Sequence, residues 1–172
     1  MAGKRQFDYC LKIKERFPDY FKHKTVLDVG SMDINGNNRF LFEDCEYIGL
    51  DIGEGENVDM ICYVHKYFTT IKYDTIISTE MLEHDKYWGK SLKQMFRLLK
   101  NEGLLLITAA TTGRAEHGTY RNEHKASPYT NDYYRNITTE MMSEGLDFNK
   151  FIKFKLDIIN TNIFFWGIKN EN

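Results

Sequence analysis

The run STEMLEHD, residues 78–85, brings together carboxylate and imidazole side chains that can move protons. Glu80 and His84 are four positions apart, so one turn of helix would place them on the same face, with Glu83 beside them. Imidazole titrates near neutral pH and therefore suits a general base. We expect Glu80 and His84 to be catalytic residues.

A second polar stretch, residues 109–136, is rich in histidine, tyrosine, arginine and asparagine and has no clear periodicity. A connection of this length is typical of a functional lid or of disorder. We expect His117 to be a third catalytic residue, and Arg114, Tyr133 and Tyr134 to contact the substrate. The alternative is that the two tyrosines pack the loop onto the core.

Asp51 ends an apolar run and follows Gly30 by 21 residues. This is close to the spacing at which a carboxylate accepts hydrogen bonds from the ribose of a bound nucleotide. A dinucleotide pyrophosphate also needs the loop GxGxxG, whereas only Gly30 and Gly36 occur here and Asp33 would repel phosphate. The spacing therefore favours a nucleoside-containing ligand and argues against NAD.

Apolar patterning predicts the elements that must position these side chains. Short apolar runs predict strands at 25–30, 46–51, 59–62, 73–78, 104–108, 151–159 and 162–168, and helical spacing predicts helices at 5–17, 87–100 and 138–145. Strands that alternate with helices predict an α/β fold, in which a parallel sheet has helices on both faces and binds its ligand at the carboxyl ends of the strands. The last two runs are separated by Asn160 and Thr161, which predicts a hairpin and hence one antiparallel strand.

Length and composition fit one domain over residues 1–172, with an N-terminal helical segment at 1–24 and a substrate-side loop at 109–136. The 172 residues are 42% hydrophobic and 28% charged, with a formal net charge of −2, so there is no basic field for non-specific nucleic-acid binding. No run is long enough for a membrane span, and the N-terminus lacks the apolar run of a signal peptide. Three irregularly spaced cysteines predict neither a disulfide framework nor a metal pair. We expect a cytoplasmic protein; its oligomeric state stays open.

Four motifs in order carry a resemblance to a known family. VLDVGSMDINGN, YIGLDIGEGENVD, YDTIISTEMLEHD and LLKNEGLLLITAATTG resemble the successive motifs of class I S-adenosylmethionine-dependent methyltransferases, and the likeness covers about residues 25–168. The resemblance implies a Rossmann-like, seven-stranded and mostly parallel sheet of order 3-2-1-4-5-7-6 with the last strand antiparallel. It also implies S-adenosylmethionine as cofactor and S-adenosylhomocysteine as product.

The resemblance implies roles for individual residues around that cofactor. Asp28, Gly30 and Ser31 would hold its amino-acid end, Asp51 its ribose hydroxyls, and Ile52 would lie against adenine. Many family members place an acidic residue after the third strand to read the adenine amino group; here Tyr63 stands at that position, with Val64 next to it. Ser78, at the end of the fourth strand, completes the expected cofactor-binding set.

The acceptor is less defined by the sequence. STEMLEHD, TTGRAEHGT and DYYRNIT together resemble a subgroup of small stand-alone methyltransferases, some of which accompany glycan-building genes, so we expect an oxygen or nitrogen acceptor on a small molecule or glycan-type substrate. DNA is not expected, because the Pro-Pro-aromatic and Pro-Cys motifs of DNA methyltransferases are absent.

Two alternatives remain. ExxEH resembles the metal-binding run of small-RNA 3′-end 2′-O-methyltransferases, in which His117 or His124 would supply a distant fourth ligand. TTGRAEHGT does not look like the corresponding segment of those enzymes, so we expect no metal. The chain would otherwise be a non-catalytic module that binds S-adenosylmethionine.

Overall fold

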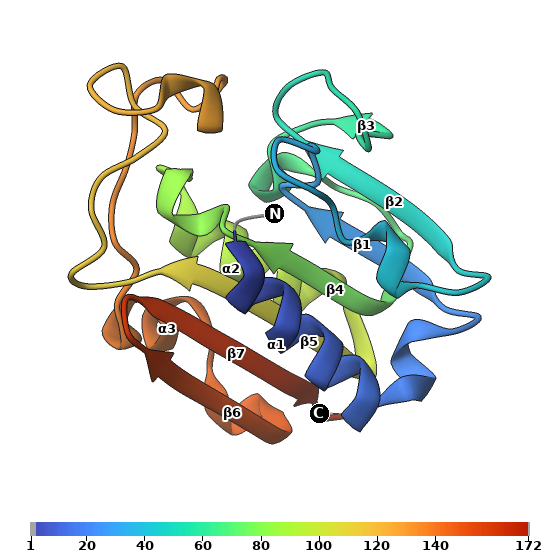
Figure 1. The fold of residues 1–172 in the computed structure, drawn as a ribbon. Coiled ribbons are helices and arrows are strands. Elements are labelled where there is room, and N and C mark those ends of the chain that lie inside the picture. The colour runs from blue at the N-terminus through green and yellow to red at the C-terminus, as the bar shows by residue number, and fades with distance from the viewer. Residues whose placement is uncertain (1–2, 172) are drawn as a thin grey trace.

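Seven strands form a single sheet in the computed structural model, which describes residues 3–171 (Figure 1). The strand order is β3-β2-β1-β4-β5-β7-β6, with every neighbouring pair from β3 to β5 parallel and with β7 antiparallel to both β5 and β6. This confirms the expected fold class and strand order. The strands are β1 (Thr25–Val29), β2 (Glu46–Asp51), β3 (Met60–Ile61), β4 (Tyr73–Thr79), β5 (Leu99–Ala110), β6 (Phe151–Ile159) and β7 (Asn162–Lys169).

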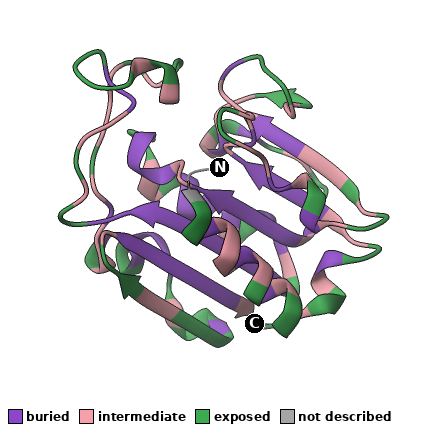
Figure 2. Ribbon diagram, in the orientation of Figure 1, coloured by how far each residue is buried: buried purple, intermediate pink, exposed green. Residues whose placement is uncertain are grey.

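Helices cover both faces of the sheet, as expected. Helix α1 (Gly3–Arg16) crosses one face, and α2 (Trp88–Leu98) and α3 (Thr139–Gly145) lie behind the other (Figure 1). Two apolar clusters result, one around α1 and one around α2 and α3. The central strands are buried between them (Figure 2), which explains why β1, β4 and β5 read as continuous apolar runs instead of alternating ones.

The transition from α2 to β5 differs from the sequence prediction. Helix α2 ends at Leu98 and β5 begins at Leu99, so residues 101–103 lie within the strand as an irregularity and do not end the helix. Glu102 has a left-handed backbone, with φ 58°. Gly103 is required by close backbone contact: a Cβ there would lie 2.9 Å from the Lys100 carbonyl oxygen and 3.0 Å from that of Asp74.

The two ends of the chain complete the domain. The hairpin of β6 and β7 turns at Asn160, which has φ 55°, and leaves β6 as the partly exposed edge of the sheet (Figure 2). The N-terminal segment contains α1 and a short 3-10 helix at Pro18–Phe21; residues 1–2 and 172 lie outside the described residues. Within residues 3–171 no helix combines the length and apolar character that crossing a membrane requires, and the three cysteines are free thiols.

Candidate functional site

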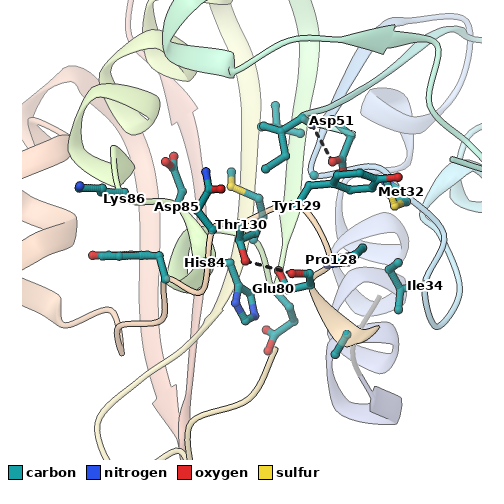
Figure 3. Close-up of a pocket in the computed structure, with 18 of the residues that line it drawn as sticks. Met32, Ile34, Asp51, Glu80, His84, Asp85, Lys86, Pro128, Tyr129 and Thr130 are labelled. Carbon is teal, nitrogen blue, oxygen red and sulfur yellow. Dashed lines mark hydrogen bonds between the residues drawn. The ribbon is translucent and has the colours of Figure 1, made fainter. Parts of the chain in front are cut away.

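A cavity of about 630 Å³ lies at the carboxyl ends of the central parallel strands (Figure 3). Val29 and Gly30 at the end of β1, Asp51 at the end of β2 and Thr79 at the end of β4 line it. Its volume is within the range of small-molecule sites. The cavity is therefore where a parallel sheet is expected to bind its ligand.

Backbone hydrogen bonds hold the Asp51 side chain on the β2 side of the cavity. Its Oδ2 accepts a hydrogen bond from the backbone N–H of Met32 at 3.0 Å, and its Oδ1 accepts from those of Ile52 at 2.7 Å and Gly53 at 3.3 Å. Burial raises the pKa of Asp51, and the three N–H groups oppose that rise. The carboxylate is thus fixed in orientation before any ligand arrives. Three more residues of the expected cofactor-binding set line the same cavity: Ile52, Tyr63 and Val64.

Three other residues of that set are turned away from the cavity. Asp28 is completely buried, where the Tyr47 hydroxyl and the Asn38 amide donate to its carboxylate and burial raises its pKa to about 6. The hydroxyl of Ser31 donates to the carbonyl of Asn57 at 3.1 Å, and that of Ser78 to the carbonyl of Val29 at 2.9 Å. These side chains bond within the protein and hold the strand ends and loop behind the cavity wall.

The segment after β4 does not form the helical turn that the sequence analysis expects. Glu80 has φ 52°, only a 3-10 helix follows at Leu82–His84, and α2 begins at Trp88. The reason is a double attachment to β5: the Glu80 N–H donates to the Thr108 carbonyl at 2.9 Å, and its Oε1 accepts from the Thr108 hydroxyl at 2.9 Å. Glu80 and His84 both line the cavity, but not as two positions on one helical face.

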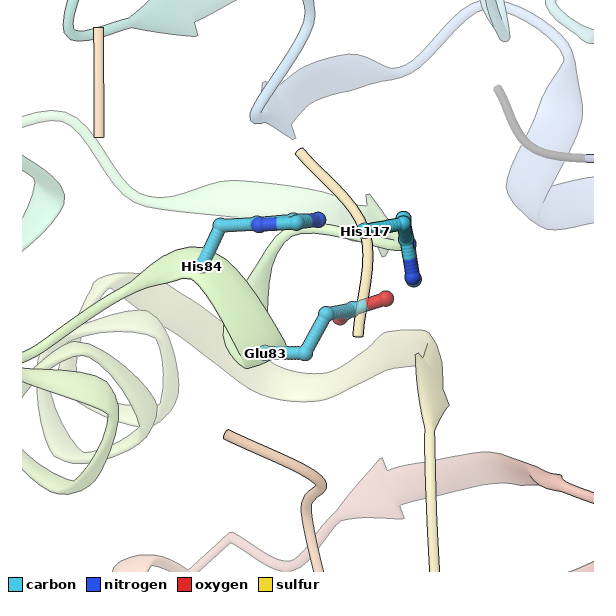
Figure 4. A group of neighbouring side chains, drawn as sticks. All are labelled: Glu83, His84 and His117. Carbon is cyan, nitrogen blue, oxygen red and sulfur yellow. The ribbon is translucent and has the colours of Figure 1, made fainter. Parts of the chain in front are cut away.

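Glu83, which we expected beside Glu80 and His84, lies with both His84 and His117. Ligand atoms of Glu83, His84 and His117 lie within 4.8 Å of one another (Figure 4), and the two imidazole rings meet edge to face at 5.0 Å. Burial raises the pKa of Glu83 well above its usual range and lowers the pKa of His84 to about 4, so the His84 imidazole is neutral at neutral pH. The ExxEH spacing was the available signal for Glu83.

Gly118 makes this close arrangement possible, and the sequence analysis missed it. It has φ 68°, and a Cβ there would lie 2.7 Å from Cε1 of His84. Any side chain at this position would push the loop away from the histidine. Its neighbour His117 could not then remain beside His84.

The loop at 109–136 forms one wall of the cavity. Two of the three residues expected to contact the substrate line this wall, and the third does not. Arg114 and Tyr133 line the cavity, whereas Tyr134 packs against the rings of His84 and His117 at 5.4 and 4.8 Å. Its hydroxyl donates to the side chain of Asn136 at 2.8 Å. One tyrosine thus faces the cavity and the other braces the histidines.

Tyr129 is a cavity residue that sequence reasoning missed, because no motif marks it. It reaches from the loop to the β2 side of the cavity and lies near Asp51 and Met32 (Figure 3). A Cβ on Gly53 would lie 2.0 Å from its ring, so the glycine leaves the space that the ring fills. The loop therefore spans the cavity from the histidines to Asp51.

Comparisons with known proteins agree with this architecture. A family model described as a methyltransferase domain matches residues 1–138. No curated protein sequence shows significant similarity to the chain. Among solved structures, phosphoethanolamine N-methyltransferase 2 of Haemonchus contortus, in complex with S-adenosyl-L-methionine, superposes with a TM-score of 0.70 at 16% identity over 96% of this chain and 53% of its own.

Two further solved structures are similar over most of both chains. The 1,6-didemethyltoxoflavin-N1-methyltransferase of Burkholderia thailandensis, with bound 1,6-didemethyltoxoflavin and S-adenosylhomocysteine, gives a TM-score of 0.66 at 15% identity over 98% of this chain and 79% of its own. The N-methyltransferase NodS of Bradyrhizobium japonicum WM9, with S-adenosylhomocysteine, gives 0.64 at 8% identity over 98% and 87%. The chain spans about half the length of the Haemonchus enzyme, and at these identities the likeness concerns the fold.

Proposed function

Because the chain belongs to the class I S-adenosylmethionine-dependent methyltransferases, with a methyltransferase-domain model matching residues 1–138, we propose that it methylates an oxygen or nitrogen atom of a small-molecule or glycan-type acceptor. S-adenosylmethionine is the methyl donor and S-adenosylhomocysteine the product. The observation that carries the proposal is the fixed Asp51 carboxylate at the end of β2, in a cavity large enough for the donor.

The charge of the cavity supports a cationic cofactor. Its lining includes the carboxyl side chains of Asp51, Glu80, Asp85, Glu123 and Asp132, but only two permanently basic ones, those of Lys86 and Arg114. S-adenosylmethionine carries a sulfonium and an ammonium against one carboxylate, so an acidic lining attracts it. NAD carries a pyrophosphate, which the same lining would repel.

The β1 and β2 side of the cavity is the proposed donor end. Asp51 would accept hydrogen bonds from the ribose hydroxyls, and Ile52, Tyr63 and Val64 would surround the adenine. The backbone at Gly30 would meet the amino-acid end. The side chains of Asp28, Ser31 and Ser78 form hydrogen bonds within the protein, behind the cavity wall. They would therefore support the loop that binds the cofactor, and only their backbone would contact the cofactor, where it reaches the cavity.

The opposite side, between β4 and the loop, is the proposed acceptor end. Glu80, His84 and His117 would surround the transferred methyl group, while Arg114 and Tyr133 would hold the acceptor. Methyl transfer is an in-line displacement in which positioning supplies much of the acceleration, and a base is needed only if the attacking atom must lose a proton. The three solved relatives described above are named as N-methyltransferases, which supports nitrogen as one of the two acceptor atoms.

Calorimetric titration of the purified chain tests the proposal. We expect S-adenosylmethionine and S-adenosylhomocysteine to bind at micromolar concentration and NAD to give no heat. Asp51→Ala removes a charged acceptor, which is worth about 1.5–3 kcal/mol, so affinity should fall at least about tenfold. Glu56→Ala changes an exposed carboxylate in the same loop and is the matched control.

Two results would contradict the cofactor site. One is the absence of binding by either sulfur ligand, and the other is unchanged affinity in Asp51→Ala. If both ligands bind as expected, transfer of a labelled methyl group to amine, hydroxyl and glycan acceptors then identifies the acceptor class.

A further inference from the structure

Three side chains with metal-binding atoms meet where β4 and β5 end. Glu83 and His84 lie in the 3-10 helix after β4, and His117 lies in the loop after β5 (Figure 4). We propose that Glu83, His84 and His117 bind one divalent transition-metal ion at the cavity wall. From the sequence we expected no metal, after weighing one held by ExxEH and either His117 or His124; the structure brings His117 to Glu83 and His84.

Two of these three side chains carry buried polar atoms that no hydrogen bond satisfies. Glu83 is completely buried and His84 is 8% exposed. Oε1 of Glu83 accepts from the backbone N–H of Ala110 at 3.2 Å. Among residues 3–171 no N–H group donates to its Oε2, whose neighbour is the Glu80 carboxyl, and Nδ1 of His84 has no hydrogen-bond partner there. A buried polar atom without a partner destabilises the fold, and a bound metal ion would satisfy it.

A backbone contact orients the His117 imidazole in the way that is common for histidines that bind metals. Nδ1 of His117 lies 3.1 Å from the carbonyl oxygen of Ala115. A carbonyl can only accept, so Nδ1 carries the proton and Nε2 keeps its lone pair. A histidine that ligates a metal almost always donates its other N–H in this way.

The donor set selects the class of ion. Two imidazole nitrogens and one carboxylate oxygen suit Zn²⁺, Fe²⁺ or Co²⁺, whereas Mg²⁺ and Ca²⁺ prefer sites made of oxygen. Three protein ligands leave at least one coordination position open. His84 and His117 line the cavity, so that open position faces the ligand space. If the proposed function holds, it faces the acceptor end.

The test measures metal binding without any methyl donor, so its result is independent of the proposed function. Chelator-stripped protein is titrated calorimetrically with Zn²⁺, and with Co²⁺ while its d–d absorption is recorded. We expect one ion per chain and a Co²⁺ spectrum typical of low coordination number. Millimolar Mg²⁺ should not displace the ion.

Variants locate the site. His117→Ala changes a loop side chain and Glu83→Gln keeps the shape of a buried one, so at least one of the two should fold as the native chain does; circular dichroism checks this. Each should weaken Zn²⁺ binding at least tenfold and abolish the Co²⁺ spectrum. His124→Ala, in the same loop, is the matched control and should bind as the wild type. Absence of binding, or wild-type affinity in either folded variant, overturns the proposal.

Discussion

Asp28 makes the stability of the protein depend on pH in a way that one substitution can isolate. The side chain is completely buried, and burial raises its pKa from 3.8 to about 6, against the opposing hydrogen bonds from Tyr47 and Asn38. The folded chain therefore binds this proton more tightly than the unfolded chain does. The resulting stabilisation is fully present below about pH 4 and is lost as the pH rises through about 6.

The size of the effect follows from the shift. A rise of about two pKa units corresponds to about 3 kcal/mol between the fully protonated and fully ionised limits, because one unit is 1.36 kcal/mol. About 2 kcal/mol of this should be lost between pH 4 and pH 7. Asp28→Asn cannot ionise at all. The free energy of unfolding of the wild type, relative to that of Asp28→Asn, should therefore fall by about 2 kcal/mol over that range.

Urea unfolding followed by circular dichroism at pH 4, 5, 6 and 7 measures this difference. The absolute stability of Asp28→Asn is not the test, because the amide changes the hydrogen bonds with Asn38 and Tyr47. Glu80 and Glu83 have raised pKa values in both proteins, so their contributions cancel in the difference. Asp44→Asn, at an exposed position, is the control and should follow the wild type. A difference that stays constant from pH 4 to pH 7 would refute the reasoning.

Substitutions at three further positions test the packing of the site and of the core. Gly118→Ala combines a positive φ with a Cβ 2.7 Å from His84, so we expect the free energy of unfolding to fall by about 1–2 kcal/mol in urea titrations; unchanged stability would contradict the geometry. Tyr129→Ala removes the ring that spans the cavity and should weaken S-adenosylmethionine binding in calorimetry, whereas Tyr129→Phe should bind nearly as the wild type because the lost hydrogen bond is 3.4 Å long. Leu92→Ala leaves a cavity in the fully buried α2 contact and should cost about 2–5 kcal/mol, measured by urea unfolding; a cost below about 1 kcal/mol would mean that the contact is not packed.

The fold could be predicted from the sequence because its signals are local and repeated. Each central strand is a short apolar run, and the hairpin at Asn160 lies where the turn residues predict it. The start of β5 could not be predicted, since residues 99–103 form an irregular pairing with β4 that depends on close backbone contact at Gly103. Such contacts join residues distant in sequence and leave no pattern in either segment.

The cavity could be predicted only in part. The position of Asp51 follows from its spacing after Gly30, because that spacing reflects the length of one strand–connection–strand unit. The inward bonding of Asp28 could not be predicted, because its partners Tyr47 and Asn38 come from a neighbouring strand and a distant loop. Tyr129 gave no signal either, since an irregular loop has no period from which its direction can be inferred.

The meeting of Glu83, His84 and His117 follows from the sheet, but the choice of carboxylate does not. Strands β4 and β5 are parallel neighbours with Thr79 opposite Thr108, so the segments that follow them must emerge side by side. A helical turn after β4 would have placed Glu80 with His84. Glu80 instead keeps its attachment to Thr108 through both backbone and side chain, and its left-handed φ redirects the chain. Glu83, the neighbour of His84 in the sequence, is the carboxylate that lies with both histidines, and sequence spacing alone cannot specify which of the two glutamates does so.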